Sequence, residues 1–188
     1  SLGTIEHLTG QIKLADKALC EFAKNDPVCR RLMTIPGVGP VTAVRFVAAL
    51  DKVERFKTAH AVASYLGLTP GENSSSERKQ MTGITKAGSS EVRRTLVQGA
   101  WTILRRFQNS PMGQWARRIA ERRGRFIAVV ALARKLSGIM FALWRDGAVI
   151  SDLTYFRADL DNEINGFSCA PPAFACTAVN EAGESRRK

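Results

Sequence analysis

Hydrophobic residues recur at steps of three and four along most of the chain, which is the spacing of amphipathic helices. The first such stripe consists of Ile5, Leu8, Ile12, Ala15, Leu19 and Phe22. Residues 1–26 enter this pattern without an initiator Met or a capping residue, so we predict the end of a long helix or coiled coil there. We therefore expect the chain to be a piece of a longer protein.

Caps and further apolar stripes predict the other helices. Asn25-Asp26-Pro27, Ser89 or Ser90, and Ser110-Pro111 have the residue types of helix starts, and Gly124 and Gly147 are placed as helix ends. The predicted helices are residues 28–34, 41–50, 58–66, 89–108, 110–124 and 125–146. In the 89–108 helix the inner stripe is Val92, Leu96, Ala100, Ile103, Leu104 and Phe107. No segment shows a strand pattern, so the predicted fold class is all-α.

The turn between the second and third predicted helices reads Ile35-Pro36-Gly37-Val38-Gly39-Pro40, with the spacing of a helix-hairpin-helix DNA-binding motif. Two glycines permit the backbone angles of a tight turn and remove side chains. Backbone N–H groups at the start of the next helix can then approach a phosphate oxygen. We predict that Gly37, Val38 and Gly39 bind DNA independently of base sequence. A plain turn with a C-cap glycine is the alternative.

Segment 67–88 is polar and has no apolar periodicity, so we predict a functional loop on a helical scaffold. It holds three serines and several cations, and two arginines follow it: Ser74, Ser75, Ser76, Arg78, Lys79 and Lys86, then Arg93 and Arg94. A serine that attacks a phosphodiester needs cations to stabilise the developing charge, and the segment supplies them. Serine-rich turns are also common solvated linkers, so residue types alone leave both interpretations open.

The charge balance favours a polyanionic partner. The chain has 28 Lys and Arg against 17 Asp and Glu, a net charge of +11. Outward-facing arginines on the last predicted helices are either a groove for a DNA or RNA backbone or a solvated face: Arg105, Arg106, Arg117, Arg118, Arg122, Arg123 and Arg125. Trp101, Trp115 and Trp144 fall on apolar stripes, so we predict core positions for them and not base-stacking platforms.

Other classes of protein fit the sequence poorly. The four cysteines form no C-x-x-C pair and the two histidines are distant from them, which does not favour a zinc site. Asp51, Glu54 and Glu72 show no ligand-like arrangement, so no metal or cofactor is predicted in this chain. The apolar segment 126–144 is interrupted by Arg134 and Lys135, which predicts a buried helix and no membrane contact. No positively charged start is followed by an apolar stretch as in a signal peptide, so we expect a cytoplasmic protein.

Several motifs stand in an order that resembles the C-terminal domain of transposases of the insertion-sequence 110 family, 1111 subgroup, also grouped as 116/110/902. The resemblance covers about residues 30–147. The motifs are Ile35-Pro-Gly-Val-Gly-Pro40, Arg55-Phe56-Lys57, Tyr65-Leu-Gly-Leu-Thr-Pro70, Ser74-Ser75, Gly83-Ile-Thr-Lys86-x-Gly88, Arg93 and Ala100-Trp101. One such motif is a weak signal, whereas the ordered series is a specific one.

The resemblance implies a two-part enzyme. An upstream nuclease-like domain would bind Mg²⁺ through four acidic residues, and this domain would carry a serine that links covalently to DNA. A structured guide RNA, a homo-oligomer and association with the nucleoid are implied as well. The family's Ser-Ser-Gly motif matches Ser74-Ser75-Ser76, so Ser75 is the expected nucleophile and Ser74 the alternative. Ser76 in place of Gly and Gly71 in place of a larger or basic residue depart from the pattern and put activity in question.

The predicted organisation has three parts: residues 1–26 as helix end or coiled coil, 27–147 as the helix-hairpin-helix transposase domain with its serine loop, and 148–188 as an extension and disordered tail. The predicted function is DNA binding and serine chemistry in transposition or recombination, in a fragment that lacks the metal-binding domain and is inactive alone. A non-catalytic DNA-binding module or inactive remnant, and a purely structural helical protein, are the alternatives.

Overall fold

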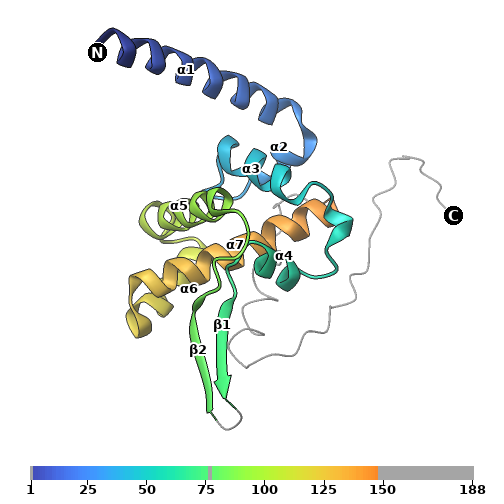
Figure 1. The fold of residues 1–188 in the computed structure, drawn as a ribbon, viewed down its shortest axis with the longest axis vertical. Helices are drawn as coiled ribbons and strands as arrows, with labels where there is room; N and C mark the ends of the chain where they lie inside the picture. Colours follow the sequence, from blue (N-terminus) through green and yellow to red (C-terminus); the bar gives the residue numbers. More distant parts are fainter. Residues whose placement is uncertain (1, 76–77, 148–188) are drawn as a thin grey trace, which may run out of the picture.

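The computed structural model describes residues 2–75 and 78–147, and the predicted 148–188 extension lies outside them. The described helices are α1 (Leu2–Asn25), α2 (Pro27–Leu32), α3 (Pro40–Leu50), the 3₁₀ turn η1 (Val53–Arg55), α4 (Ala59–Tyr65), α5 (Ser90–Arg106), α6 (Pro111–Arg123) and α7 (Arg125–Asp146). The all-α prediction is confirmed, and every predicted helix is present within a few residues of its predicted ends (Figure 1).

Side-chain caps explain why these helices begin where they do. The Asp26 carboxylate accepts a hydrogen bond from the Cys29 N–H at 2.6 Å, and Pro27 occupies the first turn of α2. The hydroxyls of Ser89 and Ser110 cap α5 and α6 in the same way. Each cap satisfies an N–H group that has no partner inside the helix, so these local sequences define the helix boundaries.

Helix α7 forms the centre of the core. It packs against α2, α4, α5, α6 and η1, and Leu132, Leu136 and Met140 are fully buried among them. It is long and apolar enough to cross a membrane, but 61% of its most apolar window is buried inside the helical body, in agreement with the predicted core helix. The charge near its middle is accommodated because Lys135 Nζ lies 4.8 Å from the centroid of the Trp115 ring.

Helix α1 contacts α2 and α3 near its C-terminal end, where Ala23 is buried, and the rest of it extends away from the body (Figure 1). Its predicted stripe is therefore exposed along most of the helix: Ile5, Ile12 and Phe22 are 61%, 61% and 58% exposed. One position of another stripe was wrong. Phe107 is not on the inner face of α5, since the helix ends at Arg106 and leaves the Phe107 side chain 41% exposed.

The serine segment is a β-hairpin and not the irregular loop that was predicted. β1 (Pro70–Ser75) pairs antiparallel with β2 (Arg78–Ile84), with an irregularity in the register between Pro70 and Glu72. The hairpin projects from the helical body on the side away from α1 (Figure 1). A projecting hairpin does not need the apolar alternation that marks a half-buried strand, which is why the sequence pattern failed to predict it.

The turn between α2 and α3 packs against α5 through two glycines. Gly37 has φ +84°, and a Cβ atom on it would lie 2.7 Å from the Gly99 carbonyl oxygen and 2.8 Å from Ile103 Cγ1. A Cβ atom on Gly99 would lie 2.9 Å from the Gly37 carbonyl oxygen. The two backbones therefore touch directly, which fixes the start of α3 against the middle of α5.

Gly37→Ala is expected to destabilise the chain by more than about 1 kcal/mol, because it combines an unfavourable positive φ with a backbone clash. Chemical unfolding followed by far-UV circular dichroism measures the change. Gly39→Ala is the matched control two residues away, since its Cβ would meet nothing within 4 Å. Equal stability losses in both variants would show that the contact with α5 is unimportant.

Candidate nucleic-acid interface

The hairpin joins the helical body at a root formed by residues 65–69 and 84–88, which we call the hairpin root. The Thr85 N–H donates to the Thr69 carbonyl at 2.9 Å, and the Lys86 N–H donates to the Gly67 carbonyl at 3.1 Å. Antiparallel pairing thus continues beyond the last strand residues. The direction in which the hairpin leaves the body is set by these backbone contacts.

Two glycines allow the chain segments of the root to touch. Gly67 has φ +68°, and a Cβ atom there would lie 2.1 Å from the Ala87 carbonyl oxygen. Gly88 has φ +76°, and its Cβ would lie 2.0 Å from the Tyr65 carbonyl oxygen. Neither position can carry a side chain without a shift of backbone. Both glycines belong to the motifs singled out in the sequence.

Arg93 ties the root to α5. Its Nη1 donates to the Leu66 carbonyl at 3.0 Å and to the Ala87 carbonyl at 3.1 Å, so a single guanidinium bridges both segments of the root. Hydrogen bonds from a charged donor are among the stronger ones. Arg93 is also predicted to contact a phosphate, and the structure adds a positioning role for the Nη1 end of its guanidinium.

A second arginine, Arg55 of η1, contacts the root through the ring of Tyr65. Arg55 Nη1 donates to the Leu50 carbonyl at 3.2 Å, and its Cζ lies 5.6 and 5.8 Å from the ring centroids of Phe56 and Tyr65. The two rings are 5.2 Å apart. Sequence reasoning gave Arg55 no role, although the Arg-Phe pair was visible as a motif.

The predicted serines lie at the far end of the hairpin. Ser74 and Ser75 end β1, and the backbone register sets Ser75 opposite Arg78 and Ser74 opposite Lys79. Four predicted site residues are therefore brought together by strand pairing. Lys86, Arg93 and Arg94 lie at or beside the root, five strand residues away, which corresponds to about 17 Å. The structure thus divides the predicted site into an outer group and a root group.

The exposed cations of the root group differ in their surroundings. Lys86 is exposed and has a left-handed φ of 56°. Arg94 is exposed and pairs with the Glu91 carboxylate, which also lies 3.2 Å from Arg45 Nη1. Exposed ion pairs of this kind contribute little to stability, so Arg94 can exchange its partner for another anion at low cost.

Only part of the predicted phosphate-binding turn, residues 37–39, lies at the surface. Gly37 faces α5, and Val38 is 7% exposed. Gly39 meets open space and is the N-cap of α3, followed by Pro40 in the first turn. The first N–H groups of a helix have no intrahelical partner, and here they lie beside Gly39. An anion could approach the turn at Gly39, whereas Gly37 and Val38 support the fold.

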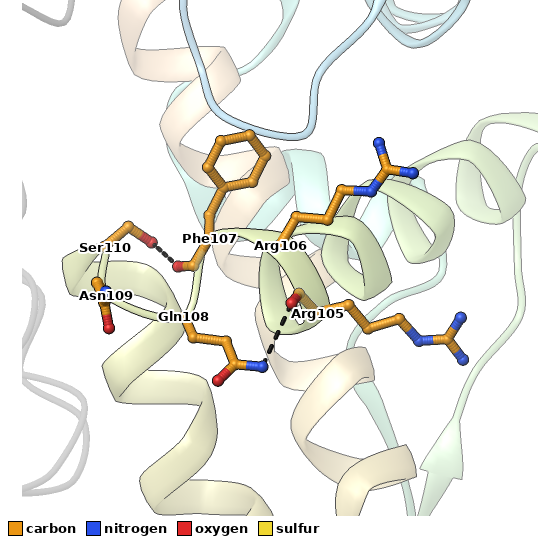
Figure 2. Close-up of a pocket in the computed structure, with 6 residues that line it drawn as sticks. All are labelled: Arg105, Arg106, Phe107, Gln108, Asn109 and Ser110. Atoms are coloured by element: carbon orange, nitrogen blue, oxygen red, sulfur yellow. Dashed lines mark hydrogen bonds between the residues drawn. The ribbon is translucent and has the colours of Figure 1, made fainter.

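Two surface hollows border α5. The first is formed by Arg105, Arg106, Phe107, Gln108, Asn109 and Ser110 between α5 and α6 (Figure 2). The turn there is closed by a hydrogen bond from Ser110 Oγ to the Phe107 carbonyl at 2.6 Å. Figure 2 shows the guanidinium groups of Arg105 and Arg106 extending outward from the helix. The second hollow lies beside the hairpin root and includes Arg94 and Trp101.

The described residues offer no set of ligands for a metal ion. Within residues 2–75 and 78–147 no group of three or more His, Cys, Asp or Glu side chains is placed to hold one. Burial and the neighbouring Asp26 carboxylate raise the pKa of the Cys29 thiol to about 12, so this thiol stays protonated at neutral pH. The resemblance assigns Mg²⁺ to an upstream nuclease-like domain and not to these residues.

Comparison with known proteins identifies the chain's relatives. Residues 29–116 match the family described as Transposase IS116/IS110/IS902. The match covers α3, the hairpin root, the hairpin itself and α5. The features described above therefore lie inside the matched segment.

Several curated relatives are transposases. The chain is 34% identical over 130 residues to "Transposase for insertion sequence element IS1111A" of Coxiella burnetii, covering 68% of the chain and 36% of that protein. It is 32% identical to "Putative transposase y4pF/y4sB" of Sinorhizobium fredii, covering 74% and 37%. It is 29% identical to "Transposase for insertion sequence element IS1328" of Yersinia enterocolitica, covering 77% and 44%. The chain thus matches less than half the length of each of these relatives.

Arg93→Ala is expected to speed hydrogen exchange at the Thr85 and Lys86 amides and to destabilise the chain by about 1–3 kcal/mol, because it leaves two carbonyls without their charged donor. Hydrogen exchange by mass spectrometry measures the first effect. Arg94→Ala removes the same charge from the adjacent, exposed position and should leave exchange at the root unchanged. If the Thr85 and Lys86 amides exchange equally fast in both variants, Arg93 does not hold the two segments of the root together.

Proposed function

The chain belongs to the IS116/IS110/IS902 family of transposases, and we propose that it is the DNA-binding and serine-bearing domain of an insertion-sequence transposase. The observation that carries the proposal is the register of the hairpin, which sets Ser75 opposite Arg78 and Ser74 opposite Lys79. A cation near an attacking hydroxyl would stabilise the charge that develops on the phosphate, which is one of the requirements of such an attack.

DNA would be bound mainly through its phosphates. The net charge of +11 supplies the long-range attraction. Arg78 and Lys79 lie on the hairpin, and Lys86 and Arg94 lie at its root. At the predicted helix-hairpin-helix turn, a phosphate would bind beside Gly39 at the start of α3. Contacts of this kind hold the duplex in register and leave the choice of sequence to another partner.

The chemistry assigned to Ser75 is transesterification. The serine hydroxyl gives its proton to solvent or a base, Oγ bonds to phosphorus, and the bond from phosphorus to one deoxyribose oxygen breaks. That oxygen takes up a proton, and the cut strand remains attached to the serine. Arg78, which the register sets opposite Ser75, would stabilise the negative charge that develops on the non-bridging oxygens of the phosphate. Reversal with another strand's hydroxyl would complete strand exchange.

The rest of the proposal follows the family resemblance. Mg²⁺ would be held by acidic residues of a nuclease-like domain outside the described residues, and a structured guide RNA would choose the DNA sites. The exposed stripe of α1, with Ile5 and Ile12, would pair with a second copy as a coiled coil. The protein would act in the cytoplasm on the nucleoid.

A second candidate is a non-catalytic DNA-binding module. Two departures from the family's motif favour it: Gly71, which lies in β1, and Ser76, which follows Ser75 in the sequence. The two candidates share DNA binding and differ in whether Ser75 forms a bond to DNA. Binding and adduct formation therefore have to be measured separately.

Duplex DNA is expected to bind with an affinity that falls steeply as salt rises, since each phosphate contact releases counterions. Fluorescence anisotropy from low to moderate salt gives the slope. The slope of log affinity against log salt concentration is proportional to the number of phosphates contacted. Replacing both Arg78 and Lys79 with Gln should make this slope shallower by the equivalent of about two phosphate contacts. Replacing Lys13 and Lys17 of α1 with Gln makes the same charge change on a helix that the proposal keeps off the DNA. Binding that is absent at low salt would favour a structural protein.

Ser75→Ala is expected to abolish covalent attachment to DNA. The test uses a hybrid in which residues 29–147 replace the matched segment of the Coxiella burnetii IS1111A transposase, incubated with DNA whose bridging phosphorothiolate traps the cut strand. Ser74→Ala is the control and should retain the adduct. An adduct in the Ser75→Ala hybrid overturns the assignment of the nucleophile. If the unsubstituted hybrid forms none while the native relative does, the non-catalytic module is supported.

A further inference from the structure

A row of cationic and aromatic side chains runs along the exposed face of α5. Arg94, Gln98, Trp101 and Arg105 are spaced by four, three and four residues, which places them on one face of the helix. Arg94, Gln98 and Arg105 are exposed and Trp101 is half-buried. We call these four residues, together with Phe126 at the start of α7, the α5 stripe. It begins beside the hairpin root.

The aromatic members of the α5 stripe are held in a fixed arrangement. Arg105 Cζ lies 4.9 Å from the Trp101 ring centroid, and the Phe126 centroid lies 6.0 Å from it with the ring planes at 84°. Phe126 is nevertheless 80% exposed. Its edge-to-face contact with Trp101 orients the ring, while most of its surface remains open. A large exposed ring with a fixed orientation is a candidate contact for a planar ligand.

The other end of the α5 stripe borders the hollow at the hairpin root. Ile84, Val97 and Trp101 give this hollow apolar walls, and Arg94 and Gln98 add polar groups to its lining. Apolar walls with a few polar groups suit a ring system that carries hydrogen-bonding edges. The hollow and the Phe126 ring are separated by Trp101, so each can contact a different ring.

We propose that the α5 stripe binds an unpaired stretch of a DNA strand. One base stacks on the Phe126 ring, another enters the hollow beside Trp101, and Arg94 and Arg105 contact the phosphates between them. Proteins that bind single-stranded nucleic acid commonly combine cations with exposed aromatic rings. The rings stack on the bases and the cations pair with the phosphates. A duplex cannot use the rings, since its base faces are already covered by neighbouring pairs.

Position argues for DNA as the occupant. The α5 stripe starts at the root of the hairpin that carries Ser75, and the strand proposed to meet that serine is DNA. The inference therefore rests on the proposed DNA binding, although it does not depend on the chemistry of Ser75. A strand that is opened for cutting or exchange exposes bases, and the α5 stripe is placed to hold them.

The test compares the binding of the full chain to a labelled single-stranded DNA oligonucleotide and to a duplex of the same length, by fluorescence anisotropy. Phe126→Leu should weaken binding of the single strand at least about fivefold, because one stacking contact is lost, and should leave duplex binding unchanged. Phe126→Tyr keeps a ring and should bind as the unsubstituted chain does. Ile127→Ala is the matched control for exposed apolar surface on the same turn, since Ile127 is 53% exposed.

Arg105→Gln should weaken single-strand binding more than Arg118→Gln, which removes an equal charge from another exposed site. The proposal is overturned if Phe126→Leu affects single strand and duplex equally or affects neither. It is also overturned if an RNA of the same sequence binds more tightly than DNA and carries the whole Phe126 effect. If the unsubstituted chain binds neither single strand nor duplex, the proposed DNA binding itself fails.

Discussion

The guanidinium of Arg93 holds the arrangement on which both parts of the proposed site depend. It donates to the carbonyls of Leu66 and Ala87, and so joins the segment entering the hairpin and the segment leaving it to the first turn of α5. Two glycine contacts, two backbone hydrogen bonds and the buried Leu68 side chain hold the root together with it. Arg93 therefore helps to set where the hairpin leaves the body beside α5.

Several of the motifs that resemble the transposase family contain residues that form or contact the hairpin root. Tyr65-Leu-Gly-Leu-Thr-Pro70 and Gly83-Ile-Thr-Lys86-x-Gly88 are its two segments, and Arg55-Phe56 packs against it through the Tyr65 ring. Glycine is required at 67 and 88 because backbone from the opposite segment occupies the place of a Cβ atom. Motifs that are separate in the sequence thus meet in one structural element, the hairpin root.

The helices could be predicted from the sequence, whereas the contacts between distant segments of the candidate site could not. Caps such as Asp26 and Ser110 act through contacts within three residues, so a local reading can recognise them. The hairpin pairs residues without apolar alternation, and the double role of Gly37 depends on Gly99, which lies on another helix. The contacts that Arg93 makes with the hairpin root were not predicted, since its acceptors lie up to 27 residues away. The importance of Trp101 could be read only after Phe126 and Arg105 were placed beside it.

The hairpin's separation from the body has a consequence for how such a site would work. An isolated two-stranded hairpin is only marginally stable in water, so this one relies on its root for order. Two cationic residues, Arg78 and Lys79, stand next to each other at the start of β2, and a phosphate backbone bound there would offset their charge. DNA would then stabilise the hairpin from the outside while the root holds it from within. Under the proposed function, the register that sets Ser75 opposite Arg78 would be most stable when DNA is bound.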